Sequence, residues 1–127
     1  MVLITKVNAY RAAVVLTGKK IRSGYFLNIL LKGAARRGTR NIVLTVFSPL
    51  GSPHYLEVLR DVIQNNIANA LNIEFGGDTP EDLERFLSNE DEVDLFLDDP
   101  STPFAEKARG LGRDFTLIPY EEVVTHE

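Results

Sequence analysis

The stretch RAAVVLTGKKIRSGYFLNILLKGAARRGTRNIVLTVF, residues 11–47, contains a complete strand–helix–strand unit. Its two ends, 11–17 and 41–47, are short β-branched and apolar runs, which are typical of strands covered on both faces of a parallel sheet. Between them, apolar residues recur at the spacing of one broad helical face: Phe26, Leu27, Leu30, Leu31, Ala34 and Ala35. Since parallel neighbours need a crossover connection, this stretch predicts a right-handed βαβ unit.

The same alternation of strands and helices continues along the chain. Outside the opening unit we expect strands at 71–75, 93–97 and 115–119, and the segment 2–8 could add a further strand or an edge arm. The alternation predicts an α/β fold: a three-layer α/β/α sandwich with a mostly parallel five-stranded sheet, Rossmann-like, in the order 3-2-1-4-5. The length of 127 residues fits a single domain spanning 1–127.

Three of the four expected helices begin with the same pair of residue types. Each pair places a hydroxyl at the N-cap, where it can accept a backbone N–H, and a proline at the first helical position. The pairs are Ser52-Pro53, Thr79-Pro80 and Thr102-Pro103. The first helix lacks this start, and Gly18, Lys19 and Lys20 stand before it instead.

Composition excludes several classes of site. The chain has no cysteine, so it has no disulfides and no thiolate ligands or nucleophiles. With only two histidines, His54 and His126, a zinc centre is not expected, and neither is any other cofactor. The apolar runs are shorter than a membrane span and the N-terminus does not resemble a signal peptide, so we expect a cytoplasmic protein without membrane contact.

Charge is divided unequally along the chain. Residues 1–60 contain ten Lys or Arg and one acid (10 − 1 = +9), and residues 61–127 contain four basic and seventeen acidic residues (4 − 17 = −13), which sums to the net −4. Such segregation concerns partners rather than fold. It is compatible with two differently solvated surfaces, with a basic face for a polyanion, or with attraction between copies in a homodimer.

The expected sheet order places one candidate site at its carboxyl rim. In open parallel sheets ligands bind where the strand order reverses, here between the loops 17–20 and 98–101. Backbone N–H groups at a helix N-terminus and two lysine ammonium groups would suit a phosphate. The candidate ligand-binding residues are Gly18, Lys19, Lys20, Ser23, Asp98, Asp99 and Ser101.

Each part of this site also has a structural interpretation. Gly18 could simply permit a tight turn beside solvated lysines, because neither phosphate-binding glycine fingerprint is present. Asp98 and Asp99 could bind Mg²⁺, pair with the lysines, or serve as turn residues before the Thr102 cap.

Evidence for catalysis in the sequence is weak. The hydroxyl and imidazole groups near the expected rim lie in no recognised nucleophile motif: Ser23, Ser48, Ser101 and His54. His54 fits a surface position in the first turn of a helix better than a general base. We therefore expect a binding module rather than an enzyme and identify no catalytic residue, with a Mg²⁺-dependent phosphodiesterase using Asp98 and Asp99 as an alternative.

A second basic cluster offers a nucleic-acid-binding alternative. Its residues lie at the end of the first helix and in the following turn: Lys32, Arg36, Arg37 and Arg40. Cations stabilise a helix C-terminus in any case, and no exposed aromatic platform for stacking bases is evident.

The order and spacing of the elements over residues 11–119 resemble those of the universal stress protein family. Strand AAVVLTG, a helix ending KGAARRG, strand NIVLTVFSP and the stretch LNIEFGGDTPEDLERFL carry this likeness, and Gly77-Asp78-Thr79-Pro80 is similar to the family's short connection into its third helix. The resemblance implies a Rossmann-like fold and a regulatory or stress-related role. It does not extend to the ATP motif, since Thr17-Gly18 stands where the family has an acid and DDPSTPFAEKARGLGRDF lacks its glycine spacing.

Two further likenesses are narrower. VVLTGKKIRSGYFLNILL and the following IVLTV, within residues 14–46, are similar to the opening of the archaeal chromatin protein family Alba, in which Gly-Lys-Lys contacts nucleic acid. The layout is also similar to Rossmann-like sensor domains that bind cyclic oligonucleotides at this crevice, often as dimers. Together these observations lead us to expect a non-catalytic module, a homodimer, that binds a nucleotide, an oligonucleotide or another phosphate-bearing anion.

Overall fold

The computed structural model describes residues 8–19, 21–51, 70–90 and 92–119. The elements in chain order are β1 (Tyr10–Val15), α1 (Ser23–Arg36), β2 (Asn41–Phe47), β3 (Ala70–Gly77), α3 (Pro80–Asn89), β4 (Asp94–Leu97), α4 (Pro103–Gly110) and β5 (Thr116–Leu117). The strand expected at 2–8 falls almost wholly outside the described residues, and the helix expected after Ser52-Pro53 falls outside them as well.

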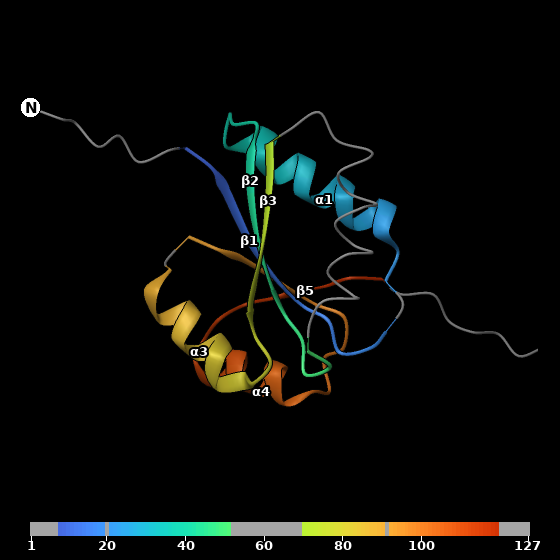
Figure 1. Ribbon diagram of the computed structural model, residues 1–127, viewed down its shortest axis with the longest axis vertical. Helices are drawn as coiled ribbons and strands as arrows, with labels where there is room; N and C mark the ends of the chain where they lie inside the picture. The colour runs from blue at the N-terminus through green and yellow to red at the C-terminus, as the bar shows by residue number, and fades with distance from the viewer. Residues whose placement is uncertain (1–7, 20, 52–69, 91, 120–127) are drawn as a thin grey trace, which may run out of the picture.

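The five strands form one parallel sheet in the order β3-β2-β1-β4-β5. α1 covers one face of this sheet, and α3 and α4 cover the other (Figure 1). The predicted fold class and strand order are therefore confirmed. The two strands that meet where the order reverses are β1 and β4, paired from Ala12 with Asp94 to Val15 with Leu97.

The two faces of the sheet contribute to separate apolar clusters, because side chains alternate along each strand. On the α1 face Phe26 packs edge-on against Phe96, with ring centroids 5.4 Å apart. On the opposite face Phe47 packs against Phe86 of α3, also at 5.4 Å. Burial on both faces is the physical reason that the β1 and β2 sequences are nearly continuous in hydrophobicity.

Most strand boundaries differ from the prediction by one or two residues. The second strand has the predicted bounds, whereas β5 is much shorter than the expected 115–119 and pairs only with Phe96 and Leu97. Phe115 lies just before β5, and its ring contacts the guanidinium of Arg109 at 5.3 Å. Because β5 pairs only with Phe96 and Leu97, Asp94 and Leu95 have no strand partner on the β5 side of the described sheet, although β1 pairs with them on the other side.

The two described Ser/Thr-Pro helix starts differ in detail. In α3 the Thr79 hydroxyl accepts the Asp82 N–H at 3.2 Å and the Asp82 carboxylate accepts the Thr79 N–H, which completes a capping box. In α4, Thr102 is at the N-cap and Pro103 follows, but the Thr102 hydroxyl donates to the Asp99 carbonyl instead of accepting from the helix. The prediction of a hydroxyl N-cap is therefore confirmed for α3 and wrong for α4.

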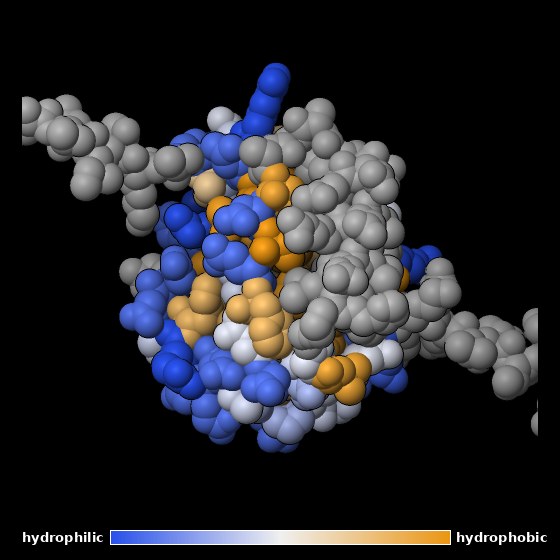
Figure 2. Space-filling view, viewed as in Figure 1, coloured by the Kyte–Doolittle hydropathy of each residue, from blue (hydrophilic) through white to orange (hydrophobic). Residues whose placement is uncertain are grey.

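The edge strand β3 retains exposed apolar surface. Figure 2 shows apolar side chains over β2 and β3, with hydrophilic residues beside them. Phe75 is 43% exposed, although Leu71 and Ile73 pack against the α1-face cluster.

Across the described residues, no helix is both long enough and apolar enough to cross a membrane.

Candidate functional site

The loops after β1 and β4 meet at the carboxyl rim of the sheet, and Asp98 joins them. One carboxylate oxygen of Asp98 accepts the Thr17 N–H at 2.7 Å and the Lys19 N–H at 3.2 Å. The other accepts the Thr17 hydroxyl at 2.7 Å. Asp98 is only 1% exposed, so its carboxylate loses its hydrogen bonds to water when the chain folds. These three donors replace those lost hydrogen bonds.

This aspartate sets the backbone shape of the β1 loop. Gly18 lies between the two residues that donate N–H groups to Asp98, and it has a φ of 117°, which side-chain-bearing residues rarely adopt. Lys19 is exposed directly after this turn. The loop therefore holds Gly18 and Lys19 at the rim in a fixed conformation.

The neighbouring loop is organised by Asp99. Its carboxylate accepts the Ser101 hydroxyl at 2.6 Å and the Ser101 N–H at 2.9 Å. These two bonds, together with the positive charge of Lys19, hold the pKa of Asp99 below its ordinary value. An ionised Asp99 thus lies within electrostatic reach of Lys19, across the junction of the two loops.

Five of the predicted ligand-binding residues are brought together in this way: Gly18, Lys19, Asp98, Asp99 and Ser101. Lys20 lies outside the described residues, and so does the side chain of Ser23. Ser23 begins α1, and the preceding Arg22 donates its N–H to the Pro119 carbonyl at 3.0 Å. The start of α1 is therefore attached to the segment that follows β5.

Asp98, one of the two candidate Mg²⁺ ligands, already has hydrogen-bond partners at this rim. Asp98 is buried and already accepts three hydrogen bonds, and its contact with Lys19 is through the backbone N–H. Within the described ranges, no group of three or more His, Cys, Asp or Glu could hold a metal ion. His54, the remaining candidate for general acid–base work, lies outside those ranges.

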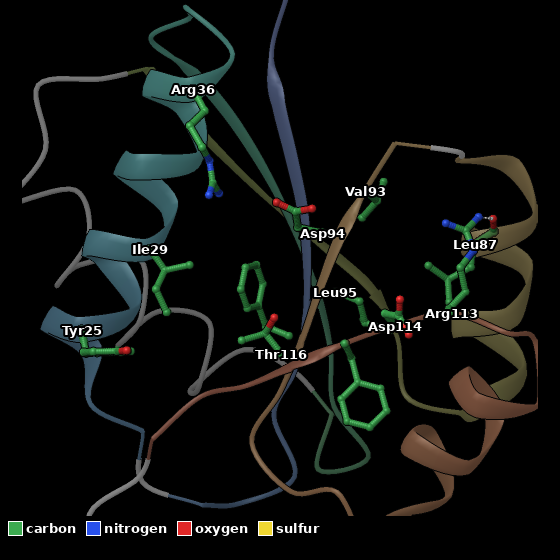
Figure 3. A pocket seen from close by; sticks show the side chains of 12 residues that line it. Tyr25, Ile29, Arg36, Leu87, Val93, Asp94, Leu95, Arg113, Asp114 and Thr116 are labelled. Atoms are coloured by element: carbon green, nitrogen blue, oxygen red, sulfur yellow. Dashed lines mark hydrogen bonds between the residues drawn. The ribbon is translucent and has the colours of Figure 1, made fainter.

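The four residues of the nucleic-acid alternative are all exposed but have different surroundings. Arg37 forms an ion pair with Glu92 at 3.0 Å, and Lys32 and Arg40 are exposed on α1 and on the turn before β2. Arg36 points toward the beginning of β4, where Figure 3 shows it opposite Asp94.

A cavity of about 610 Å³ lies at that end of β4, and it was not predicted from the sequence. It opens along the sheet edge that the short β5 leaves uncovered, between α1 on one side and α3 on the other (Figure 3). On the α1 side its walls are Tyr25, Ile29, Arg36, Asp94, Phe96 and Thr116. On the α3 side, Arg113 donates to the carbonyls of Leu87 and Glu90 at 2.7 and 2.8 Å.

Asp94 is held at the cavity by a buried tyrosine. The Tyr10 hydroxyl donates to one carboxylate oxygen of Asp94 at 2.7 Å, although Tyr10 itself is only 1% exposed. Burial, followed by the bond to Asp94, raises the pKa of Tyr10 far above its ordinary value, so the hydroxyl stays protonated. Tyr10 fits below α1 because Gly33 has no Cβ: one built there would lie 2.3 Å from the ring.

No protein-family model matches this chain, and neither a curated protein nor a solved structure matches it. Function therefore has to be inferred from the geometry and chemistry of these two regions.

Proposed function

We propose that this protein is a non-catalytic module that binds a phosphate-bearing anion, with a nucleotide as the favoured ligand, at the rim between β1 and β4. The observation that carries the proposal is the fixed turn at Gly18 and Lys19, which three hydrogen bonds attach to the buried Asp98. A cation after a rigid glycine turn, at the reversal point of a parallel sheet, suits a phosphate group.

In this proposal Asp98 positions the loop and does not contact the ligand. Lys19 supplies the charge, and the exposed Gly18 allows a phosphate oxygen to approach the backbone closely. The Asp99 carboxylate, which accepts two hydrogen bonds from Ser101, places a negative charge beside Lys19. It lowers the net positive charge of the rim, so the rim attracts anions of low charge less strongly.

The resemblance to universal stress proteins supports a regulatory or stress-related role in the cytoplasm, but it does not identify the anion, because the family's ATP motif is absent from this chain. A homodimer is part of the proposal, supported by the opposite charges of the two halves of the chain. Sedimentation analysis over a salt series tests the dimer: charge-driven association weakens as salt rises, whereas a monomer at low salt contradicts it.

A thermal-shift titration with ATP and with inorganic pyrophosphate at low salt tests the binding site. Ligand at a hundredfold excess over its dissociation constant stabilises the fold by about 2.7 kcal/mol, which is readily measured as a rise in melting temperature. We expect Lys19→Ala combined with Lys20→Ala to abolish this rise.

The matched control is Lys32→Ala combined with Arg40→Ala, which removes the same charge from exposed positions away from the rim. If both double variants weaken binding equally, general electrostatic attraction explains the effect and the rim site is wrong. The absence of any shift with either ligand would also contradict the proposal.

A further inference from the structure

The cavity at the beginning of β4 has the size and the mixed lining of a small-molecule site. Its volume of about 610 Å³ lies within the range of roughly 300–1,000 Å³ that is usual for ligand pockets. The cavity lies near the start of β4, whereas the Gly18–Lys19 turn lies beyond the carboxyl ends of β1 and β4. Any ligand here would therefore be separate from the proposed anion.

The charges around the cavity balance one another. Arg36 and Arg113 supply two positive charges, and Asp94 and Asp114 supply two negative ones. Arg113 is engaged with the carbonyls at the end of α3. The balance favours a neutral ligand that carries both donors and acceptors over a simple anion.

Two polar groups on the α1 side are available to such a ligand. One oxygen of Asp94 accepts the Tyr10 hydroxyl, which fixes the carboxylate and leaves the other oxygen open to the cavity. Among the ion pairs formed between described residues, none includes Arg36. Figure 3 shows the Arg36 guanidinium and the Asp94 carboxylate facing the same space from α1 and β4.

The remaining walls on this side suit a flat ring. Tyr25 is 53% exposed and points toward the cavity from the same helix face as Ile29 (Figure 3). Phe96, which packs against Phe26, also lines the cavity. Exposed aromatic side chains are common contact surfaces for flat rings.

We propose that this cavity binds a guanine base, read by Asp94 and Arg36. A carboxylate accepts hydrogen bonds from the N1–H and the exocyclic amine of guanine, and a guanidinium donates to O6 and N7. These groups lie side by side on the base, so a carboxylate and a guanidinium that face one cavity without pairing are complementary to it. Adenine presents an acceptor at N1 and an amine at C6, which reverses this pattern.

The experiment is a titration of the full chain, labelled with ¹⁵N, with guanosine, inosine and adenosine, followed by backbone amide shifts. Guanosine lacks a phosphate, so its binding reports on this cavity independently of the rim. We expect guanosine to shift amides of α1 and β4, inosine to bind more weakly because it lacks the exocyclic amine, and adenosine to produce no shift. The absence of guanosine shifts up to about 1 mM, or equal shifts with adenosine, would overturn the proposal.

Variants separate this site from the rim and from the other half of the cavity. We expect Asp94→Ala and Arg36→Ala each to weaken guanosine binding at least tenfold. Asp114→Ala and Arg40→Ala are the matched controls, because the first removes a negative charge from the other half of this cavity and the second removes a positive charge outside it. Lys19→Ala, at the rim, should leave guanosine binding unchanged. If Asp114→Ala weakens binding as much as Asp94→Ala, or if Asp94→Asn and Asp94→Ala both bind normally, the assignment is wrong.

Discussion

Asp94 begins strand β4 and Asp98 follows its last residue, yet the two aspartates are used in opposite ways. Asp98 is buried and accepts three hydrogen bonds from the β1 loop. Asp94 is exposed and accepts one, from the Tyr10 hydroxyl. The difference shows that the number of internal donors, rather than the residue type, decides whether a carboxylate supports the fold or stays available to a ligand.

The largest expected effect compares the two aspartates directly. Asp98→Ala leaves the Thr17 N–H and hydroxyl and the Lys19 N–H without their acceptor, so we expect the free energy of unfolding to fall by about 2–4 kcal/mol. Asp94→Ala should cost about 1 kcal/mol, since water in the cavity can replace it as the acceptor for Tyr10. Urea denaturation measures both, and equal losses would contradict the comparison.

A smaller effect on stability is expected at Gly33, which leaves room for the ring of Tyr10, the hydrogen-bond partner of Asp94. A Cβ at Gly33 would lie 2.3–2.7 Å from atoms of the Tyr10 ring, so Gly33→Ala should lower the free energy of unfolding by about 1–2 kcal/mol despite the better helix propensity of alanine. Gly24→Ala is the matched control in the same helix, because nothing lies within 4 Å of its Cβ. It should stabilise the fold slightly in the same denaturation experiment. If both changes stabilise the fold, Tyr10 does not pack against Gly33 as described.

The smallest effect concerns Asp99, beside the buried aspartate. Its pKa is lowered mainly by the Ser101 hydroxyl, so the stability it contributes is fully present above the ordinary carboxyl pKa near 3.8 and is lost as pH falls through the lower folded value. Ser101→Ala should therefore lower the melting temperature at neutral pH, with a difference from the unaltered protein that shrinks below about pH 4. A difference that is the same at pH 3 and pH 7 would show that Asp99 is not the group involved.

The sheet order and the meeting of the two rim loops could be predicted from the sequence, because each depends on patterns that repeat locally. Strand runs such as 41–47 and the Thr79-Pro80 start carry their signals within a few residues. The hydrogen bonds from Thr17 and Lys19 to Asp98 could not be predicted. Asp98 and Asp99 are equivalent in the sequence, and only packing decides which of them is buried.

The cavity at β4 was missed for a related reason. It depends on β5 being only two residues long and on Gly33, Tyr10 and Asp94 meeting from three separate elements. No motif joins these residues, which lie far apart in the chain. A glycine within an otherwise apolar helix was the available signal, because such a glycine often marks close packing.

The contact between Thr17 and Asp98 also bears on the order of folding, because the two residues are 81 positions apart in the chain. β1 and β2 are joined through a single helix and can pair early, whereas β4 must return across the whole molecule to reach the other side of β1. We expect the central β1–β4 ladder to close late, so that amide protection at Thr17 should appear after protection of the β1–β2 pair during refolding.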